Sequence, residues 1–210
     1  VVFRIRRKAA ELEANVAILF DLQGPSIRTG DLAEPYHLKK GDTVEIRLGT
    51  AKPELPFSTT VNYDGLLQDV QAGHTMVVDN GGILMRIAEV RPDRLICDVL
   101  TEGVFGSRRH INLPGVALRL PALTEKDLAD LAVAVECETD YVAMSFVRDA
   151  AHIAQLREHI DNLGGKAQIV AKIEDQQAVR HIDDIILAAD VIMVARGDLG
   201  IEVSIEELPI

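Results

Sequence analysis

Three charged residues stand where two apolar runs of this sequence end. Lys172 and Glu174 belong to the run QIVAKIED, and Asp198 follows Gly197 shortly after the run VIMVA. Because side chains alternate along a strand, Lys172 and Glu174 should point to the same side. Two carboxylates suit Mg²⁺, whose remaining ligands are usually water and substrate phosphates. Lys172 would supply a point positive charge beside that ion, and Gly197 would let a ligand approach the backbone.

The segment 168–202 is predicted to form strand, crossover helix and strand. Asp175 is placed to cap the helix, and Val179, Ile182 and Ile186 recur at helical spacing, which predicts a buried face. VIMVA is apolar on both faces, as in a parallel strand covered by helices. Neighbouring strands lie about 4.8 Å apart, so Glu174 and Asp198 would project from adjacent carboxyl ends. The alternative, a solvated Lys-Glu pair followed by a turn, fits poorly with such apolar flanks.

Composition narrows the class of protein. The chain has 210 residues, 48% of them hydrophobic, with Lys+Arg 22 against Asp+Glu 33 and a net charge of −11. These values indicate a globular, acidic protein and disfavour nucleic acid or an anionic membrane as a partner. Cys97 and Cys137 have neither disulfide-framework nor zinc-site spacing, so both are expected to be inert thiols. No signal peptide or long apolar run is found, which makes a cytoplasmic address the default.

The chain changes character twice, which predicts three segments. Residues 1–24 indicate an amphipathic helix and then a strand at 16–20. Residues 25–119 hold short β-rich runs separated by turns such as Asp79-Asn80-Gly81-Gly82, typical of a small inserted all-β barrel domain. In 120–210 the α/β rhythm returns with a helix capped by Thr124 and Asp127, in which Leu128, Leu131 and Val135 are expected to face inward.

Four predicted strands alternate with helices, which predicts an α/β fold with a parallel sheet. A complete (β/α)₈ barrel usually has about 250 residues, so segments 1–24 and 120–210 would make a partial TIM (β/α)₈ barrel. We therefore expect these residues to be an excerpt of a longer protein.

Several stretches, in this order, resemble the pyruvate kinase family over the whole chain. They are DLQGPSIRTG (21–30), NLPG (112–115), LPALTEKDLADL (120–131), DYVAMSFVRDA (140–150), IVAKIEDQQAV (169–179) and DVIMVARGDLGIEV (190–203). The resemblance implies a glycolytic kinase that transfers the phosphoryl group of phosphoenolpyruvate to ADP, giving pyruvate and ATP. It also implies a homotetramer in the complete protein.

The resemblance assigns the charged cluster to catalysis. Lys172 would stabilise the phosphoryl group in transfer, while Glu174 and Asp198 would hold Mg²⁺ or Mn²⁺. The backbone at Gly197 and Asp198 would receive the substrate carboxylate, and Ser145 lies at the family's substrate-side serine.

The resemblance also implies residues that would bind the nucleotide and K⁺. Arg28 matches an arginine that contacts nucleotide phosphate, and Arg109 stands where the family usually has a lysine that does so. K⁺ would be bound by Asp21 and by the backbone carbonyl of Leu22. Ser26 departs from the Glu or Lys usual in the family, which leaves the dependence on K⁺ open.

Two alternatives stay open at the level of sequence. A Mg²⁺-dependent barrel lyase acting on pyruvate-like acids could use the same metal pair, although it has no need of a lid over a nucleotide. The 210 residues could also be a non-catalytic fragment, because half a barrel need not hold the metal-site residues in register.

Overall fold

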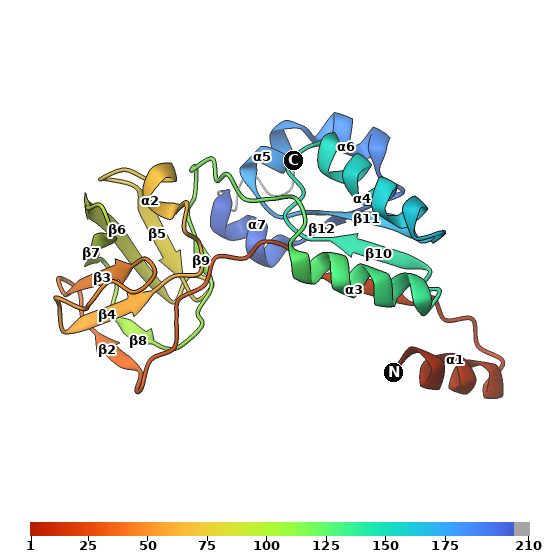
Figure 1. Ribbon diagram of the computed structural model, residues 1–210, viewed down its shortest axis with the longest axis horizontal. Helices are drawn as coiled ribbons and strands as arrows, with labels where there is room; N and C mark the ends of the chain where they lie inside the picture. The colour runs from red at the N-terminus through yellow and green to blue at the C-terminus, as the bar shows by residue number, and fades with distance from the viewer. Residues whose placement is uncertain (204–210) are drawn as a thin grey trace. The chain divides into compact units, whose positions relative to one another are not determined.

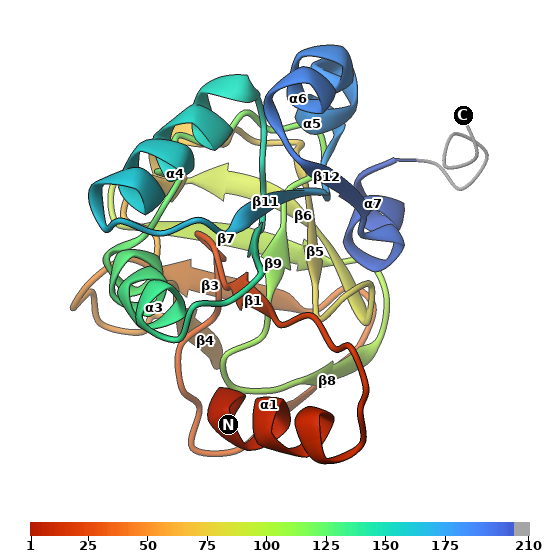
Figure 2. The same cartoon turned by 90° about the vertical axis from the view of Figure 1, so that its right-hand side faces the viewer.

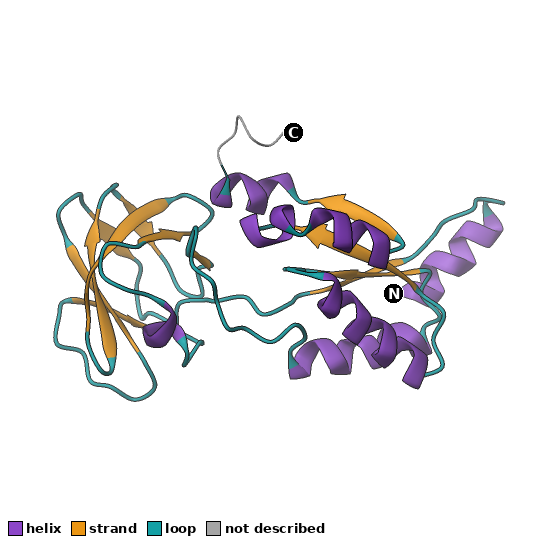
Figure 3. Cartoon of the chain, turned by 90° about the horizontal axis from the view of Figure 1, so that it is seen from above, coloured by secondary structure: helices purple, strands orange, loops and turns teal. Residues whose placement is uncertain are grey.

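The computed structural model describes residues 1–203 and divides into two compact units (Figure 1). One unit is formed by Val1–Pro25 together with Pro121–Leu199, and the other contains Ser26–Leu120. Helices and strands are mixed in the first unit, whereas the second is built mainly of strands (Figure 3). The predicted barrel segment extends to residue 210, and its part 204–210 lies outside the described residues.

Four parallel strands form the sheet of the first unit. They are β1 (Leu19–Leu22), β10 (Tyr141–Met144), β11 (Gln168–Ile173) and β12 (Val191–Val194). The sheet order β1-β10-β11-β12 follows the chain, and every neighbouring pair is parallel. Their carboxyl ends therefore share one edge of the sheet. Strands that alternate with helices in a parallel sheet confirm the predicted α/β class and the partial (β/α)₈ barrel.

Helices follow the strands of this unit (Figures 1 and 2). They are α3 (Glu125–Glu136), α4 (Ala150–Asn162), α5 (Gln176–Arg180), α6 (Ile182–Ala188) and α7 (Arg196–Glu202). Helix α3 packs on β1, while α4 packs on β11 and on α6. An N-terminal helix α1 (Val2–Glu11) precedes β1 and buries none of its side chains. Helices α3 and α4 therefore pack against strands of this sheet.

The first turn of α3 is fixed by a complete capping box, as its sequence predicts. The Thr124 hydroxyl accepts a hydrogen bond from the Asp127 amide, and the Asp127 carboxylate accepts one from the Thr124 amide. Asp127 is fully buried, and its other oxygen accepts from the Gly24 amide at 3.0 Å. One carboxylate thus starts a helix and ties down the loop that follows β1.

Asp127→Ala is expected to lower the free energy of unfolding of this unit by about 2–4 kcal/mol, because it removes a cap and strands a buried amide. Asp130→Ala on the same helix is the control. Among the residues that the structure describes, the Asp130 carboxylate makes an ion pair with Lys126 only, at i,i+4, so its loss should cost less than about 0.5 kcal/mol. Urea unfolding of the full-length protein measures both, and equal effects would contradict the role given to Asp127.

Two details of the sequence reading are wrong at the start of this unit. The first strand occupies Leu19–Leu22 and not 16–20, so Asp21 lies within it. Leu128 is 37% exposed, since α3 turns Asp127, Leu131 and Ala134 inward. In both cases the general element is correct, and its bounds or its buried face differ from the prediction.

The predicted crossover helix is two helices. It breaks at His181, where φ is −108° and ψ is 21°, and the break changes which residues face inward. Val179 and Ile186 are exposed, while Ala178 and Ile185 are buried. The cap by Asp175 is confirmed, since its carboxylate accepts from the Ala178 amide at 2.7 Å.

Strand β12 also differs from its prediction, because its side chains are not buried on both faces of the sheet. Val191, Met193 and Val194 are each more than a third exposed. In the four-stranded sheet this strand lies at the edge and has a neighbour on one side. The apolar run VIMVA does not show that β12 is the outer strand of this four-stranded sheet, and this position accompanies the exposure of its side chains.

The second unit is built on a six-stranded sheet with the order β4-β3-β7-β6-β5-β9. Its strands are β3 (Thr43–Arg47), β4 (Phe57–Thr60), β5 (Thr75–Val78), β6 (Ile83–Val90), β7 (Arg94–Val99) and β9 (Ile111–Asn112). A separate pair joins β2 (Tyr36–Leu38) to β8 (Gly103–Phe105). The hairpin predicted at Gly81-Gly82 is confirmed between β5 and β6. One short helix, α2 (Leu66–Asp69), interrupts the otherwise all-β pattern.

A single extended segment links the two outer strands of this sheet. Arg28 forms a β-bridge with His110, beside β9, and Thr29 forms one with Val61, beside β4. We call this line of contacts, from Ile27 to Gly30, the closing seam. Backbone hydrogen bonds extend it on both sides, because the Ile111 amide donates to the Ile27 carbonyl and the Gly30 amide donates to the Thr60 carbonyl. The sheet therefore closes into a small barrel, which leaves neither outer strand with a free edge at this point.

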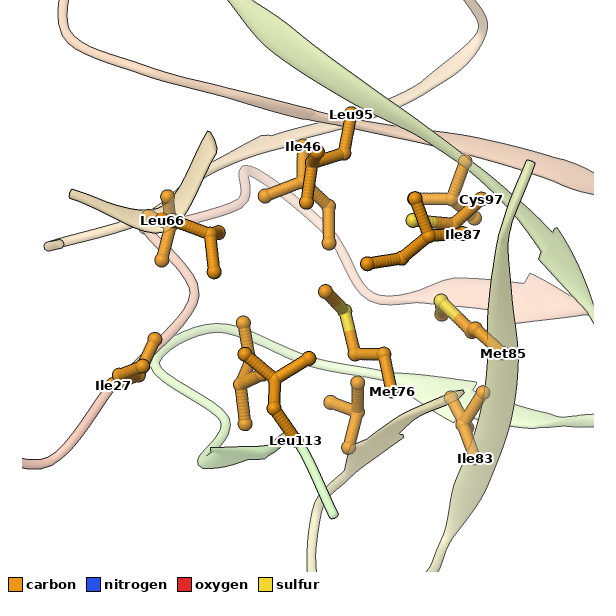
Figure 4. Close-up of a cluster of buried hydrophobic side chains, with 14 of the residues drawn as sticks. Ile27, Ile46, Leu66, Met76, Ile83, Met85, Ile87, Leu95, Cys97 and Leu113 are labelled. Carbon is orange, nitrogen blue, oxygen red and sulfur yellow. The ribbon is translucent and has the colours of Figure 1, made fainter. Parts of the chain in front are cut away.

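The interior of this barrel is apolar. Figure 4 shows part of the cluster, in which Met76 and Met85 lie with Ile87, Leu95 and Cys97 among the buried side chains. Burial raises the pKa of the Cys97 thiol to about 12, so this residue is unreactive, as its isolated position predicts. No helix among residues 1–203 is long and apolar enough to cross a membrane.

Candidate functional site

The ammonium of Lys172 lies among oxygen atoms from three neighbouring strand ends. It donates to the Ser145 hydroxyl at 2.9 Å and lies 3.1 Å from Glu174 Oε1. Both carboxylate oxygens of Asp21 are 3.3 Å away. Asp21 belongs to β1, Ser145 follows β10, and Lys172 and Glu174 are at the end of β11. Parallel pairing brings these four side chains together, as the sequence predicts for Lys172 and Glu174.

The charge of Lys172 is secured by its neighbours. Its partial burial by itself would lower the pKa, but the negative charges of Glu174 and Asp21 outweigh this, and the pKa is raised. The Ser145 hydroxyl fixes the direction of the side chain. A lysine so held presents a permanent positive charge at the carboxyl edge of the sheet.

Glu174 is the most deeply buried of these charged groups, with 2% of its side chain exposed. Its second oxygen accepts a hydrogen bond of 2.7 Å from the Phe146 amide. Burial raises the pKa of Glu174, Lys172 and the Phe146 amide lower it, and the charge of Asp198 raises it again, so the net direction is upward. A carboxylate in this environment is stabilised by additional positive charge.

The loop after β10 is shaped to deliver these contacts. Phe146 has a φ of 55°, unusual for a residue with a side chain, and this conformation turns its amide toward Glu174. Gly24 in the loop after β1 has a φ of 70°, and a Cβ there would lie 3.1 Å from the Ser145 Cβ. Each of the two loops therefore has a residue with positive φ beside Ser145, and at Gly24 a larger side chain would crowd Ser145.

Asp198 and Gly197 lie in the first turn of α7, directly beyond β12. A Cβ added to Gly197 would meet no atom within 4 Å, so the backbone there is open to a ligand. Asp198 is near enough to Glu174 for its charge to act on that carboxylate. The strand ends thus bring the predicted carboxylate pair into one neighbourhood.

The donor set fits a divalent cation that has additional ligands from elsewhere. Across residues 1–203 no three His, Cys, Asp or Glu side chains form a group able to hold a metal ion. The two carboxylates of Glu174 and Asp198 match Mg²⁺, which takes one or two protein carboxylates and completes its octahedron with water and phosphate oxygens.

The remaining predicted residues are placed as follows. Leu22 ends β1 with its side chain 1% exposed, so only its backbone could serve a cation. Arg28 and Arg109 both belong to the second unit, at the closing seam of its barrel. The Arg28 guanidinium donates to the Ser26 hydroxyl at 3.2 Å and to the Arg108 carbonyl at 3.1 Å.

Comparison with known families gives a match over the whole chain. The family model described as "Pyruvate kinase, barrel domain" matches residues 1–210. The chain belongs to the pyruvate kinase family. This confirms the resemblance of the sequence motifs, and it does not favour the alternative of a lyase.

Curated pyruvate kinases are similar along the same length. "Plastidial pyruvate kinase 2" of Arabidopsis thaliana is 38% identical over 100% of this chain and 36% of its own length. "Pyruvate kinase" of Clostridium perfringens is 38% identical over 98% of this chain and 44% of its own. "Pyruvate kinase" of Mycobacterium tuberculosis is 38% identical over 99% of this chain and 44% of its own length. The chain therefore spans less than half the length of these relatives.

Sequence reasoning missed three contacts around this candidate site. The Phe146 amide has no signal in the sequence, because any residue can supply a backbone N–H. Asp127 was identified only as a cap, although it also holds Gly24. The pairing of the Asp21 carboxylate with Lys172 was not predicted, and the role of Asp21 toward K⁺ stays a prediction.

Proposed function

We propose that the full-length protein transfers the phosphoryl group of phosphoenolpyruvate to ADP, giving pyruvate and ATP in glycolysis. The observation that carries this proposal is the position of the Lys172 ammonium among Ser145, Glu174 and Asp21 at the carboxyl ends of adjacent parallel strands. Phosphoryl transfer needs fixed positive charge more than covalent chemistry, and this arrangement supplies it.

In this proposal each site residue has one task. Lys172 neutralises charge on the phosphoryl group during transfer, and Ser145 keeps its ammonium on the substrate side. Glu174 and Asp198 would hold Mg²⁺ or Mn²⁺. When bound, such an ion neutralises and aligns substrate and phosphoryl oxygens. The open backbone at Gly197 and Asp198 would receive the substrate carboxylate.

The nucleotide and a monovalent cation complete the proposal. Arg28 and Arg109 would contact the phosphates of ADP or ATP, from the β-rich segment 25–119 acting as a lid that excludes water. Asp21 and the carbonyl of Leu22 would bind K⁺, in which case the Asp21 carboxylate serves both the ion and Lys172. The barrel segments 1–24 and 120–210 would hold the reacting groups.

Assembly and location are proposed from the family resemblance. The full-length protein is expected to be a homotetramer in the cytoplasm, although one relative is named a plastidial protein. No nucleic acid or membrane partner is proposed for this acidic chain.

The direct test is pyruvate formation by the full-length protein from phosphoenolpyruvate, ADP and Mg²⁺. We expect turnover of about 1–10³ per second, within the usual range of enzymes. The control omits ADP while keeping Mg²⁺ and phosphoenolpyruvate. Absence of pyruvate in the complete mixture, or equal formation without ADP, would refute phosphoryl transfer to the nucleotide.

A further inference from the structure

The seam that closes the β-barrel separates the two arginines proposed for the nucleotide. Arg28 is paired with His110, and the neighbouring Thr29 accepts a hydrogen bond from the Arg109 amide through its hydroxyl at 2.8 Å. Since directly paired residues share a face, Arg28 and Arg109 extend from opposite faces of the seam. Arg109 extends on the face of the buried residues Thr29 and Ile111. The surroundings of its guanidinium are therefore set by the barrel.

Two nitrogens of the Arg109 guanidinium are covered from one side. Nε is buried and has no hydrogen-bond partner among residues 1–203. A Cβ on Gly106 would lie 2.8 Å from both Nε and Nη2, so the guanidinium packs against the backbone of that glycine. An anion arriving from solvent must therefore use the other side of the group, where Nη1 lies.

Asp79 already occupies that side. Its carboxylate Oδ1 lies 3.2 Å from Arg109 Nη1, and the side chains are 41% and 42% exposed, so a ligand can reach the pair. Asp79 is held in the turn after β5 with a φ of 58°, and its amide donates to the His110 carbonyl at 3.0 Å. The turn thus fixes a negative charge at the nitrogen that a phosphate would need.

We propose that Asp79 competes with the nucleotide's phosphates for Arg109 and so weakens binding of a nucleoside diphosphate. This inference rests on the proposed contact of Arg109 with nucleotide phosphate. A phosphate at Nη1 must displace the Asp79 carboxylate or share the nitrogen with it against like-charge repulsion. Asp79 therefore sets the affinity below what Arg109 alone would give.

The test is the variant Asp79→Asn in the full-length protein, with ADP binding measured by calorimetry. Asn keeps the shape and adopts positive φ readily, so the turn is preserved while the charge is lost. We expect the Kd for ADP to fall by about three- to fivefold, the scale of an exposed ion pair, and the difference to shrink in high salt.

Asp31→Asn is the matched control. Asp31 pairs with Arg108, the neighbour of Arg109, through distances of 2.7 and 2.9 Å, and it is also exposed. Removing this charge should leave the Kd for ADP unchanged. Asp79→Asn should also have no effect in an Arg109→Gln background, since the competing partner is then absent.

The outcomes separate this inference from the proposed function. If Arg109→Gln weakens ADP binding but Asp79→Asn leaves it unchanged or weakens it too, competition is refuted and the contact of Arg109 with nucleotide stands. If Arg109→Gln leaves ADP binding unchanged, that contact itself is wrong, and the inference is overturned with it. An equal gain in Asp31→Asn would reduce the effect to general charge and refute a specific role for Asp79.

Discussion

Lys172→Met in the full-length protein is expected to lower kcat by about a thousandfold, the scale of removing one preorganised charge from a transition state. Met has a similar length and retains the apolar stem, so what is lost is the ammonium between Ser145, Glu174 and Asp21. The KM for phosphoenolpyruvate should change much less, because the charge is needed most while the phosphoryl group is in transfer. Steady-state pyruvate formation measures both constants.

Two controls accompany this variant. Lys126→Met makes the same chemical change on α3, where the lysine is exposed and, within residues 1–203, forms an ion pair with Asp130 alone. Its kcat should equal that of the parent. Lys172→Arg keeps the charge but replaces a point charge by a planar fork, so it should recover only part of the activity. Full activity of Lys172→Met in folded protein would remove Lys172 from the mechanism.

Glu174→Gln is expected to weaken binding of Mg²⁺ or Mn²⁺ by about 10–100-fold and to lower kcat by about 10²–10³-fold. The side-chain carbonyl oxygen of Gln can still accept the hydrogen bond that the Phe146 N–H now donates to Glu174 at 2.7 Å. The loop after β10 therefore keeps this contact. What disappears is the buried negative charge opposite Lys172. Mn²⁺ binding followed by electron paramagnetic resonance reports the metal directly, apart from turnover.

Asp175→Asn is the matched control for the metal site. Asp175 is the next residue, its pKa is likewise raised by burial, and its carboxylate caps α5 through the Ala178 amide. Asn is an equally good cap, so the fold is preserved while one nearby charge is lost. Mn²⁺ affinity should change by less than about threefold, the scale of weak pairs. An equal loss in both variants would argue that Glu174 acts through net charge and is not a ligand.

The α/β unit illustrates how far pattern reasoning reaches. The alternation in QIVAKIED was enough to place Lys172 and Glu174 on one side of β11, because a strand has no freedom in that respect. Parallel pairing then follows from the alternation of strands and helices, and with it the meeting of carboxyl ends. The caps at Thr124 and Asp175 were equally readable, since the required side chains lie within the same turn.

Where the sequence reading failed, the structure has features that the spacing of apolar residues does not report. The break at His181 exposes Val179 and Ile186, although their spacing suits a continuous helix. The exposure of β12 depends on its place at the sheet edge. The burial of a side chain depends on which elements pack against its helix or strand, whereas periodicity reports only which residues share a face.

By itself the sequence determined the family, the partial parallel barrel and the common face of Lys172 and Glu174, because these depend on local periodicity and on long motifs. Only the tertiary structure decided that Asp21 and Ser145 meet the Lys172 ammonium, that the Phe146 amide supports Glu174, and that Asp79 lies at Arg109. Each of these contacts joins segments that are far apart in the chain or uses a backbone group common to all residues. Their geometry exists only after the strands have paired and the loops have taken their positive-φ turns.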